Sequence, residues 1–219
     1  MLWYRCLFVL YKVSKSRSFQ FFGDLTHRIE TDEKIVALTF DDGPTTYTNE
    51  VLSALKDKNV KATFYVTGQG LEAYPDIGKA LVEEGHELGN HSYSHPRFLL
   101  KSQSFIKQEI EQTNTLIRET GFSGPITFRP PFGKKLFSLP WYLMRQGIRT
   151  VTWDIEPDSY SSERDFIVDY TLQNTKSGSI ILLHPFCKSC GGKREAIPLI
   201  IDQLQIDGFR SVTISELIN

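Results

Sequence analysis

The chain has 219 residues, a hydrophobic fraction of 40% and a formal net charge of −1. This length suits a single domain with a substantial core, and the composition excludes a wholly disordered chain. Because there is neither a basic excess nor a Lys/Arg-rich stripe, nucleic acid is not an expected partner. We expect a monomer.

The first stretch, Met1 to Lys12, is the part of the chain that looks most like a targeting signal. It is too short to span a bilayer, which takes roughly 20 apolar residues, and Arg5 interrupts it. No small-residue cleavage pattern follows, so we interpret it as a poor signal peptide and leave the compartment open. We expect residues 1–30 to be an extension that packs on the domain or associates weakly with a membrane, without a transmembrane span. Residues 31–219 are expected to form one domain.

Strand-like and helix-like segments alternate along the rest of the chain. Seven runs rich in β-branched and aromatic residues predict strands at 35–38, 61–66, 86–89, 126–128, 148–153, 179–183 and 209–213. Between them, apolar periodicity and helix boundary residues predict helices at 50–56, 76–84, 104–120, 140–146, 162–176 and 194–207. This alternation indicates parallel βαβ units and an α/β fold.

Polar residues follow five of the seven expected strands. They are Asp41 and Asp42 after the first, His91 after the third, Arg129 after the fourth, Asp154 after the fifth and His184 after the sixth. An open sheet concentrates its site at one switch point, whereas a barrel gathers residues from the ends of many strands. The distribution therefore favours a distorted, seven-stranded (β/α) barrel as a single domain.

Two adjacent carboxylates, Asp41 and Asp42, end the first expected strand, and Gly43-Pro44 then stops regular structure. Burying two neighbouring anions costs on the order of several kcal/mol unless a cation neutralises them. The pair therefore predicts a positive charge close by.

His91 and His95 are four residues apart, a spacing that lets both imidazoles reach one ion. Alone, such a pair is more often an ordinary loop feature, but the two neighbouring carboxylates favour a metal site. Two histidines and a carboxylate with open positions are typical of catalytic zinc, and Asp42 is the expected third ligand. The same donor set occurs in non-haem iron oxygenases, which have no need of the further charged residues at these strand ends. The expected cofactor is one divalent ion, zinc before cobalt or nickel.

Four motifs, in this order, resemble those of the polysaccharide deacetylases, carbohydrate esterase family four: Thr39–Pro44, His91–Pro96, Arg129–Gly133 and Leu182–His184. The resemblance extends over about residues 35–217. It implies a distorted (β/α) barrel, in agreement with the strand-end argument. It also implies a metal-dependent hydrolase that removes N-acetyl groups from an amino-sugar polymer of the chitin or peptidoglycan type.

The resemblance and the needs of amide hydrolysis together suggest the roles of the site residues. The expected metal ligands are Asp42, His91 and His95. Asp41 is the expected base, Arg129 would pair with it and keep it ionised, and His184 is the expected acid. The backbone amide of Phe132 is the expected oxyanion donor; the family usually has Tyr there, and a backbone donor survives that change. Leu182 is expected to line the pocket for the acetyl methyl group.

One family motif departs from its usual form. The family has an Asp-Trp pair that tunes the acid histidine and walls the substrate groove, whereas this chain has Trp153-Asp-Ile-Glu-Pro-Asp-Ser-Tyr160. We prefer Asp158 as the partner of His184, with Asp154 and Glu156 as alternatives. Trp153 is expected to contact substrate.

Three cysteines, Cys6, Cys187 and Cys190, do not make a disulfide framework. The last two could be a disulfide, a soft-metal site or two loop thiols. Because no second cysteine pair completes a zinc site, an ordinary loop pair is the preferred interpretation.

Two other functions stay open: a non-catalytic carbohydrate-binding relative, and an O-acetyl esterase, which differs only in the leaving group. The first is disfavoured because ligands, base, arginine and acid are all present. The expected partner is an N-acetylated glycan. Chitin oligomers, peptidoglycan, a small acetylated sugar conjugate and acetylated xylan all fit the motifs.

Overall fold

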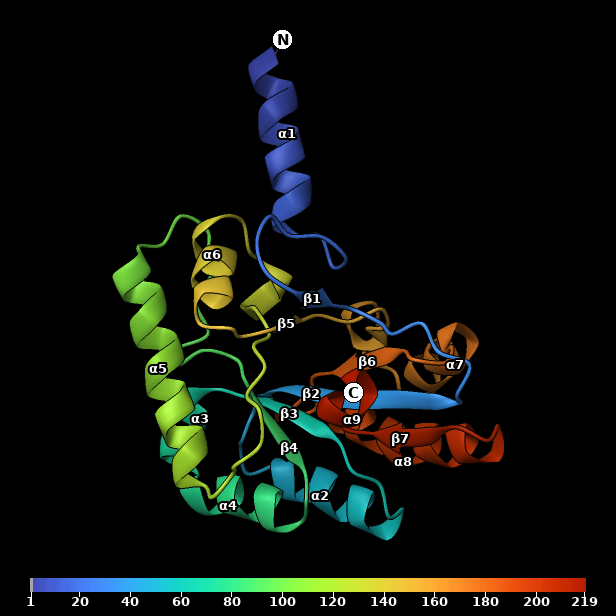
Figure 1. The fold of residues 1–219 in the computed structure, drawn as a ribbon. Helices are drawn as coiled ribbons and strands as arrows, with labels where there is room; N and C mark the ends of the chain where they lie inside the picture. Colours follow the sequence, from blue (N-terminus) through green and yellow to red (C-terminus); the bar gives the residue numbers. More distant parts are fainter. Residues whose placement is uncertain (1) are drawn as a thin grey trace.

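The computed structural model describes the backbone of residues 2–219, and the side chains of Arg5 and of residues 7–219. Helix α1 (Leu2–Ser14) extends away from the body of the molecule, in which helices surround a parallel sheet (Figure 1). Among the described helices, none combines the length and the apolar character needed to cross a bilayer.

All strand pairs in the sheet are parallel, as the alternation predicts. The neighbouring strands run in the order β4 (Glu87–Asn90), β3 (Thr63–Val66), β2 (Ile35–Gly43) and β6 (Ile180–Leu183). β7 (Arg210–Val212) pairs with the first half of β2, and β1 (Leu25–Thr26) pairs with β5 (Thr150–Val151). Because Ala37 of β2 pairs with Ile180 on one side and Val212 on the other, β7 does not separate β6 from β2.

Single bridges, rather than strand ladders, join β4 to β6 around the remaining side of the barrel. They link Asn90 to Phe128, Phe128 to Thr150, and Ile155 to Ile181. The ladders alone therefore leave the barrel unclosed, which is its distortion. The strand predicted at 126–128 is wrong except for single bridges at Phe128, because the flanking Pro125 and Pro130 lack the amide donors that a ladder needs. The predicted strand at 148–153 is shortened to β5.

Six helices match the predicted ones: α2 (Thr48–Asp57), α4 (Pro75–Glu83), α5 (Gln103–Glu119), α6 (Ser138–Arg145), α7 (Arg164–Asn174) and α8 (Gly191–Ile206). Two further short helices, α3 (Gly68–Ala73) and α9 (Ile214–Ile218), were not expected. α3 contains two glycines, which have low helix propensity, and its start depends on the Thr67 hydroxyl accepting from the Gly70 amide.

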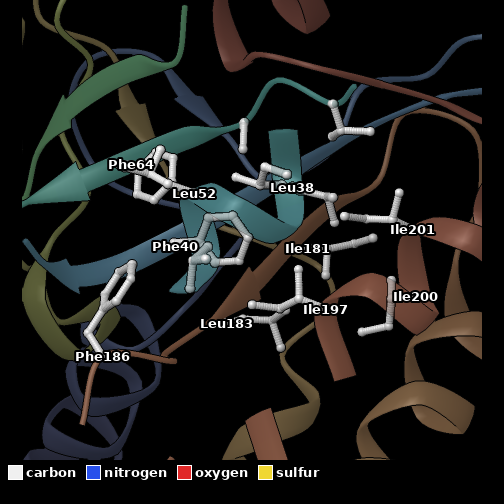
Figure 2. Close-up of a cluster of buried hydrophobic side chains, with 14 of the residues drawn as sticks. Leu38, Phe40, Leu52, Phe64, Ile181, Leu183, Phe186, Ile197, Ile200 and Ile201 are labelled. Carbon is white, nitrogen blue, oxygen red and sulfur yellow. The ribbon is translucent and has the colours of Figure 1, made fainter. Parts of the chain in front are cut away.

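Strand alternation divides the side chains of β2 between the core and the site. Leu38 and Phe40 point toward α2 and α8, where they join Ile181 of β6 in the largest apolar cluster (Figure 2). The residues between them, Thr39 and Asp41, point to the other face, where both contact a buried arginine described below. The core thus fixes which side chains reach the barrel interior.

Cys187 and Cys190 are joined by a disulfide in the connection between β6 and α8. This finding replaces both the loop-thiol and the soft-metal interpretations.

Candidate active site

The adjacent carboxylates both reach the site because the strand is irregular between them. In a regular strand, neighbouring side chains point to opposite faces. Here the β2–β3 register shifts between Asp41 and Gly43, and Asp42 has a left-handed φ of 72°. Asp41 is therefore buried inside the barrel, whereas 45% of the Asp42 side chain remains exposed at the barrel mouth.

Asp42, His91 and His95 offer ligand atoms that all lie within 4.8 Å of one another. The Asp42 Oδ1 atom lies 3.2 Å from Nε2 of His95 and 3.5 Å from Nε2 of His91. The Nδ1–H of His91 donates to the Arg129 carbonyl at 2.8 Å, so its Nε2 lone pair faces the cluster. Such a backbone partner behind a ligating imidazole is typical of metal sites, and the residues fit a divalent ion.

The protonation states of these groups also suit a metal. Burial and the neighbouring His91 lower the pKa of His95, which favours its neutral, ligating form. Burial opposes ionisation of Asp42, but in the metal-free site a protonated His91 can donate to this carboxylate, which outweighs burial and holds the pKa of Asp42 well below the usual range. An anionic carboxylate and a neutral imidazole are the forms that bind cations.

The loop that carries both histidines is held by two residues that the sequence did not single out. Buried Glu109 of α5 accepts from the Tyr93 and Ser94 amides at 3.0 and 2.8 Å, and from the Ser94 hydroxyl at 2.7 Å. Asn90 accepts from the Ser92 amide at 2.7 Å. The only sequence signal for Glu109 is a carboxylate at a position on the apolar side of an amphipathic helix.

Arg129 is fully buried and pairs with Asp41. Its Nη1 atom donates to Asp41 Oδ1 and to the Thr39 hydroxyl, each at 2.8 Å. The guanidinium lies 4.0 Å from the centre of the Tyr65 ring, and Nη2 donates to the Thr152 carbonyl at 3.2 Å. The arginine thus supplies the positive charge that a buried carboxylate requires.

His184 follows β6 and faces Asp158. Its backbone amide donates to Asp158 Oδ2 at 2.6 Å, and its Nδ1 lies 3.2 Å from Oδ1. Burial opposes the charged imidazole, but the hydrogen bond and charge of Asp158 prevail and raise the pKa of His184 to about 9. The alternatives are occupied elsewhere: Asp154 accepts from the Ser179 hydroxyl and the Ile180 amide, and Glu156 from the Trp153 indole.

These groups open into one cavity of about 520 Å³. The residues predicted from the motifs that line it are Asp41, Asp42, His91, His95, Phe132, Trp153 and His184. Leu182 does not: it is fully buried in the core below, with Ala37 and Val151. Asp158 also lies behind the lining, against His184. Lys15, Arg17, Lys134, Glu156 and Ser159 were missed as lining residues.

Phe132 borders the cluster of Asp42, His91 and His95, here called the metal cluster, next to His95. It has a left-handed φ of 58°, is 52% exposed, and its ring centroid lies 4.6 Å from that of His95. The turn at Pro131–Gly133 therefore brings the Phe132 backbone to the cavity wall.

Comparisons with known proteins agree with this arrangement. The family model described as polysaccharide deacetylase matches residues 28–151. A peptidoglycan-N-acetylglucosamine deacetylase of Bacillus cereus is 33% identical over 90% of this chain and 93% of its own length. A crystal structure of a peptidoglycan N-acetylglucosamine deacetylase, in complex with an N-oxidanyl-benzamide, superposes with a TM-score of 0.84 at 32% identity, over 88% of this chain and 92% of that one.

One solved relative is described differently. A wild-type pseudoenzyme of the same family, from Bacillus anthracis, is 26% identical with a TM-score of 0.81 over 89% of this chain and 69% of that one. Membership alone therefore does not guarantee turnover. The match to the family model and the near full-length relative nevertheless show that this chain belongs to the polysaccharide deacetylase family, carbohydrate esterase family four, whose fold is a distorted (β/α) barrel.

Proposed function

We propose that the protein is a metal-dependent deacetylase that hydrolyses N-acetyl groups of an amino-sugar polymer of the peptidoglycan type. The observation that carries the proposal is the arrangement of one cavity: the Asp41–Arg129 and His184–Asp158 pairs and the Asp42-His91-His95 cluster all open into it or directly support its lining. Its near full-length relative, a peptidoglycan deacetylase, supports the substrate class.

Asp42, His91 and His95 would hold the metal, for which zinc is our first choice and cobalt or nickel the alternatives. When bound, such an ion supplies Lewis-acid chemistry: it polarises the acetyl carbonyl and lowers the pKa of water. The N-oxidanyl amide bound to the solved relative belongs to a chemical class that chelates metals, and this supports the assignment for this chain.

Asp41 is proposed to take the proton from the attacking water. Its carboxylate is held in one orientation by Arg129 on Oδ1, while Oδ2 faces the metal cluster 3.5 Å from His91 Nε2. A base needs a free lone pair aimed at the reacting water, and this arrangement leaves Oδ2 for that purpose. The Phe132 amide is proposed to donate to the carbonyl oxygen as negative charge develops on it.

His184 is proposed to protonate the departing amine. With a pKa of about 9 it carries a proton at neutral pH, and Asp158 holds Nδ1, leaving Nε2 to donate. Donation to the amine nitrogen breaks the carbon–nitrogen bond without expelling a strongly basic anion. Trp153, whose indole is fixed by Glu156, is proposed to wall the sugar.

The boundary near residue 30 remains our proposal for the catalytic domain, with residues 14–17 adding to its cavity wall.

The test of function is acetate release from chitooligosaccharides, peptidoglycan strands and acetyl-xylan, by metal-stripped, zinc-reloaded and Asp41→Asn protein. Asp57→Asn, on the exposed end of α2, is the matched control.

Release that needs zinc, disappears in Asp41→Asn and persists in Asp57→Asn is the expected result. Release from acetyl-xylan alone would instead indicate an O-acetyl esterase. Zinc binding and glycan binding without release from any substrate would indicate a non-catalytic relative, as the pseudoenzyme in the family makes a concrete alternative.

A further inference from the structure

Residues 14–17, here called the N-terminal strap, lead from the end of α1 onto the body of the molecule (Figure 1). Lys15 and Arg17 of this strap line the cavity. Three of the four strap carbonyls are held by the barrel. The Lys135 amide donates to Ser14 at 2.9 Å, the buried Lys135 ammonium donates to Ser16, and the Thr152 hydroxyl donates to Arg17. The strap is therefore a fixed part of the cavity wall.

The acidic groups in the cavity already have positive partners. Asp41 is paired with Arg129, and Glu156 is paired with Arg17, whose guanidinium lies 4.9 Å from the centre of the Trp153 ring. Asp42 faces His91 and His95, where the proposed metal ion would be its positive partner. None of these carboxylates is left to neutralise another cation.

Two cations in the same lining, Lys15 of the strap and Lys134 beyond the Phe132 turn, have no such partner. In the described part of the chain, neither ammonium has a carboxylate within 4.0 Å. Both instead lie over the ring of Tyr11, at 4.4 and 5.5 Å from its centre, and Lys15 donates to the Tyr11 hydroxyl at 3.2 Å. Their combined field, with that hydrogen bond from Lys15 as the largest cause, lowers the pKa of the exposed Tyr11 hydroxyl.

We propose that Lys15 and Lys134 form a carboxylate-binding subsite, and that the enzyme prefers an amino-sugar polymer carrying carboxylates over neutral chitin. The proposal rests on the proposed deacetylase function and specifies its substrate. Ammonium–carboxylate hydrogen bonds are short and charge-assisted, and an uncompensated positive rim raises the local concentration of an anionic polymer. Because the strap backbone is fixed, only the lysine side chain on it has to be ordered when substrate binds.

A peptidoglycan chain offers carboxylates from two sources. One is the lactyl group on the N-acetylmuramic acid sugar, and the other is the side peptide. The test uses glycan strands freed of peptide, which expose lactyl carboxylates, the same strands with those carboxylates converted to methylamides, and strands that keep their peptides. Dissociation constants and kcat/KM for acetate release are measured on each with the zinc-loaded protein.

We expect the carboxylate-bearing strands to be preferred over the methylamidated ones by about tenfold in both quantities, and the preference to shrink in about 0.5 M NaCl. The double variant Lys15→Gln/Lys134→Gln should bring the ratio close to one. Lys56→Gln/Lys107→Gln removes the same charge from exposed helix positions and should leave the ratio as it is in wild type. A preference confined to the peptide-bearing strands would assign the side peptide as the source of the carboxylate.

Two results would overturn the subsite. One is that wild type does not prefer either kind of carboxylate-bearing strand over the methylamidated strands, and the other is that the preference persists in the double variant. These results are separate from failure of the proposed function. If acetate is released equally from all strands, the deacetylase holds and the subsite fails. If the lysine-dependent preference appears in binding while no strand loses acetate, the subsite holds and the deacetylase fails.

Discussion

The two sides of the cavity hold histidines in two different environments. On the metal side, His91 donates Nδ1–H to a backbone carbonyl and His95 has a lowered pKa, so both imidazoles suit ligation. Across the cavity, His184 faces the carboxylate of Asp158 and its pKa is raised to about 9. The Nδ1 atom of His91 thus faces a neutral carbonyl and that of His184 an anion, in keeping with the ligand and acid roles proposed for them.

The largest expected effect comes from replacing one histidine on each side. His91→Ala removes a ligand, so we expect metal content to be lost together with roughly 10³-fold or more of kcat. His184→Ala removes only the proton donor, so we expect full metal content and a kcat lower by roughly 10²–10⁴-fold. Metal analysis and acetate release on the same preparations make the comparison.

His86→Ala is the control for histidine loss, since this buried imidazole bonds to the Ala62 amide away from the cavity. It should keep its metal. Normal metal content in His91→Ala, or loss of metal in His184→Ala, would break the division between the two sides.

Asp158→Asn should lower the pKa of His184, the proposed acid. Without the carboxylate, the pKa of His184 is expected to fall from about 9 toward its ordinary 6.5. The alkaline limb of the pH–rate profile then moves down, and at pH 8 the loss of protonated histidine alone lowers kcat about 30-fold. Asp154→Asn, which is not in contact with His184, should leave this limb in place.

The same pair affects stability. A histidine whose pKa is raised on folding stabilises the folded state fully below its ordinary pKa, and this contribution is lost as the pH rises through about 9. We expect the free energy of unfolding of wild type to fall by at most about 3 kcal/mol between neutral pH and pH 10, and this fall to be absent in Asp158→Asn. Urea unfolding at both pH values measures it; equal falls in the two proteins would contradict the assignment.

A smaller effect is expected from Glu109→Gln on the metal side. The amide keeps one acceptor oxygen where the carboxylate uses two, so the loop carrying His91 and His95 loses part of its support. We expect zinc affinity to drop about tenfold with little change in the alkaline limb. Glu111→Gln, on the same helix and exposed, is the control. Unchanged zinc affinity in Glu109→Gln would show that the loop needs no such support.

The smallest effect is expected from Lys193→Gln. Its ammonium lies 3.2 Å from Asp158 Oδ2 and competes with His184 for that carboxylate. Removing it should raise the pKa of His184 slightly and move the alkaline limb upward, with kcat at neutral pH changed by less than about twofold. A downward movement would mean that Lys193 orients Asp158 rather than competing for it.

The order of strands and helices was predictable where periodicity is long. α5 and α8 appear within a few residues of their predicted ends, whereas the strand predicted at 126–128 did not survive its flanking prolines. The missed helix α3 has two glycines and too few turns to show an apolar face.

The candidate site was predictable where residues follow strands directly. Asp41, His91, Arg129 and His184 occur at strand ends, and strand alternation carries Asp41 and His184 to the barrel interior. Leu182 was assigned to the cavity by resemblance alone and lies in the core instead.

The lysines of the lining could not be predicted, because no local pattern tells where an N-terminal segment will cross the barrel. Lys15 lies at the cavity because the barrel donates hydrogen bonds to the backbone carbonyls of its neighbours in the strap. Every residue type offers such a carbonyl, so the sequence carries no signal for this contact. Glu109 was hidden for a related reason, since it accepts from the backbone amides of Tyr93 and Ser94, which every residue type except proline offers equally.

Arg129 is hydrogen-bonded both to a proposed metal ligand and to the proposed base. Its carbonyl accepts from the metal-side His91, and its guanidinium holds the base, Asp41. The separation between base and ligand is consequently set within a single residue, by bond lengths and one side-chain rotamer, instead of by how well several barrel segments pack. When thermal motion changes the width of the cavity, the Asp41 carboxylate and the His91 imidazole should therefore be displaced together, and their alignment should be kept.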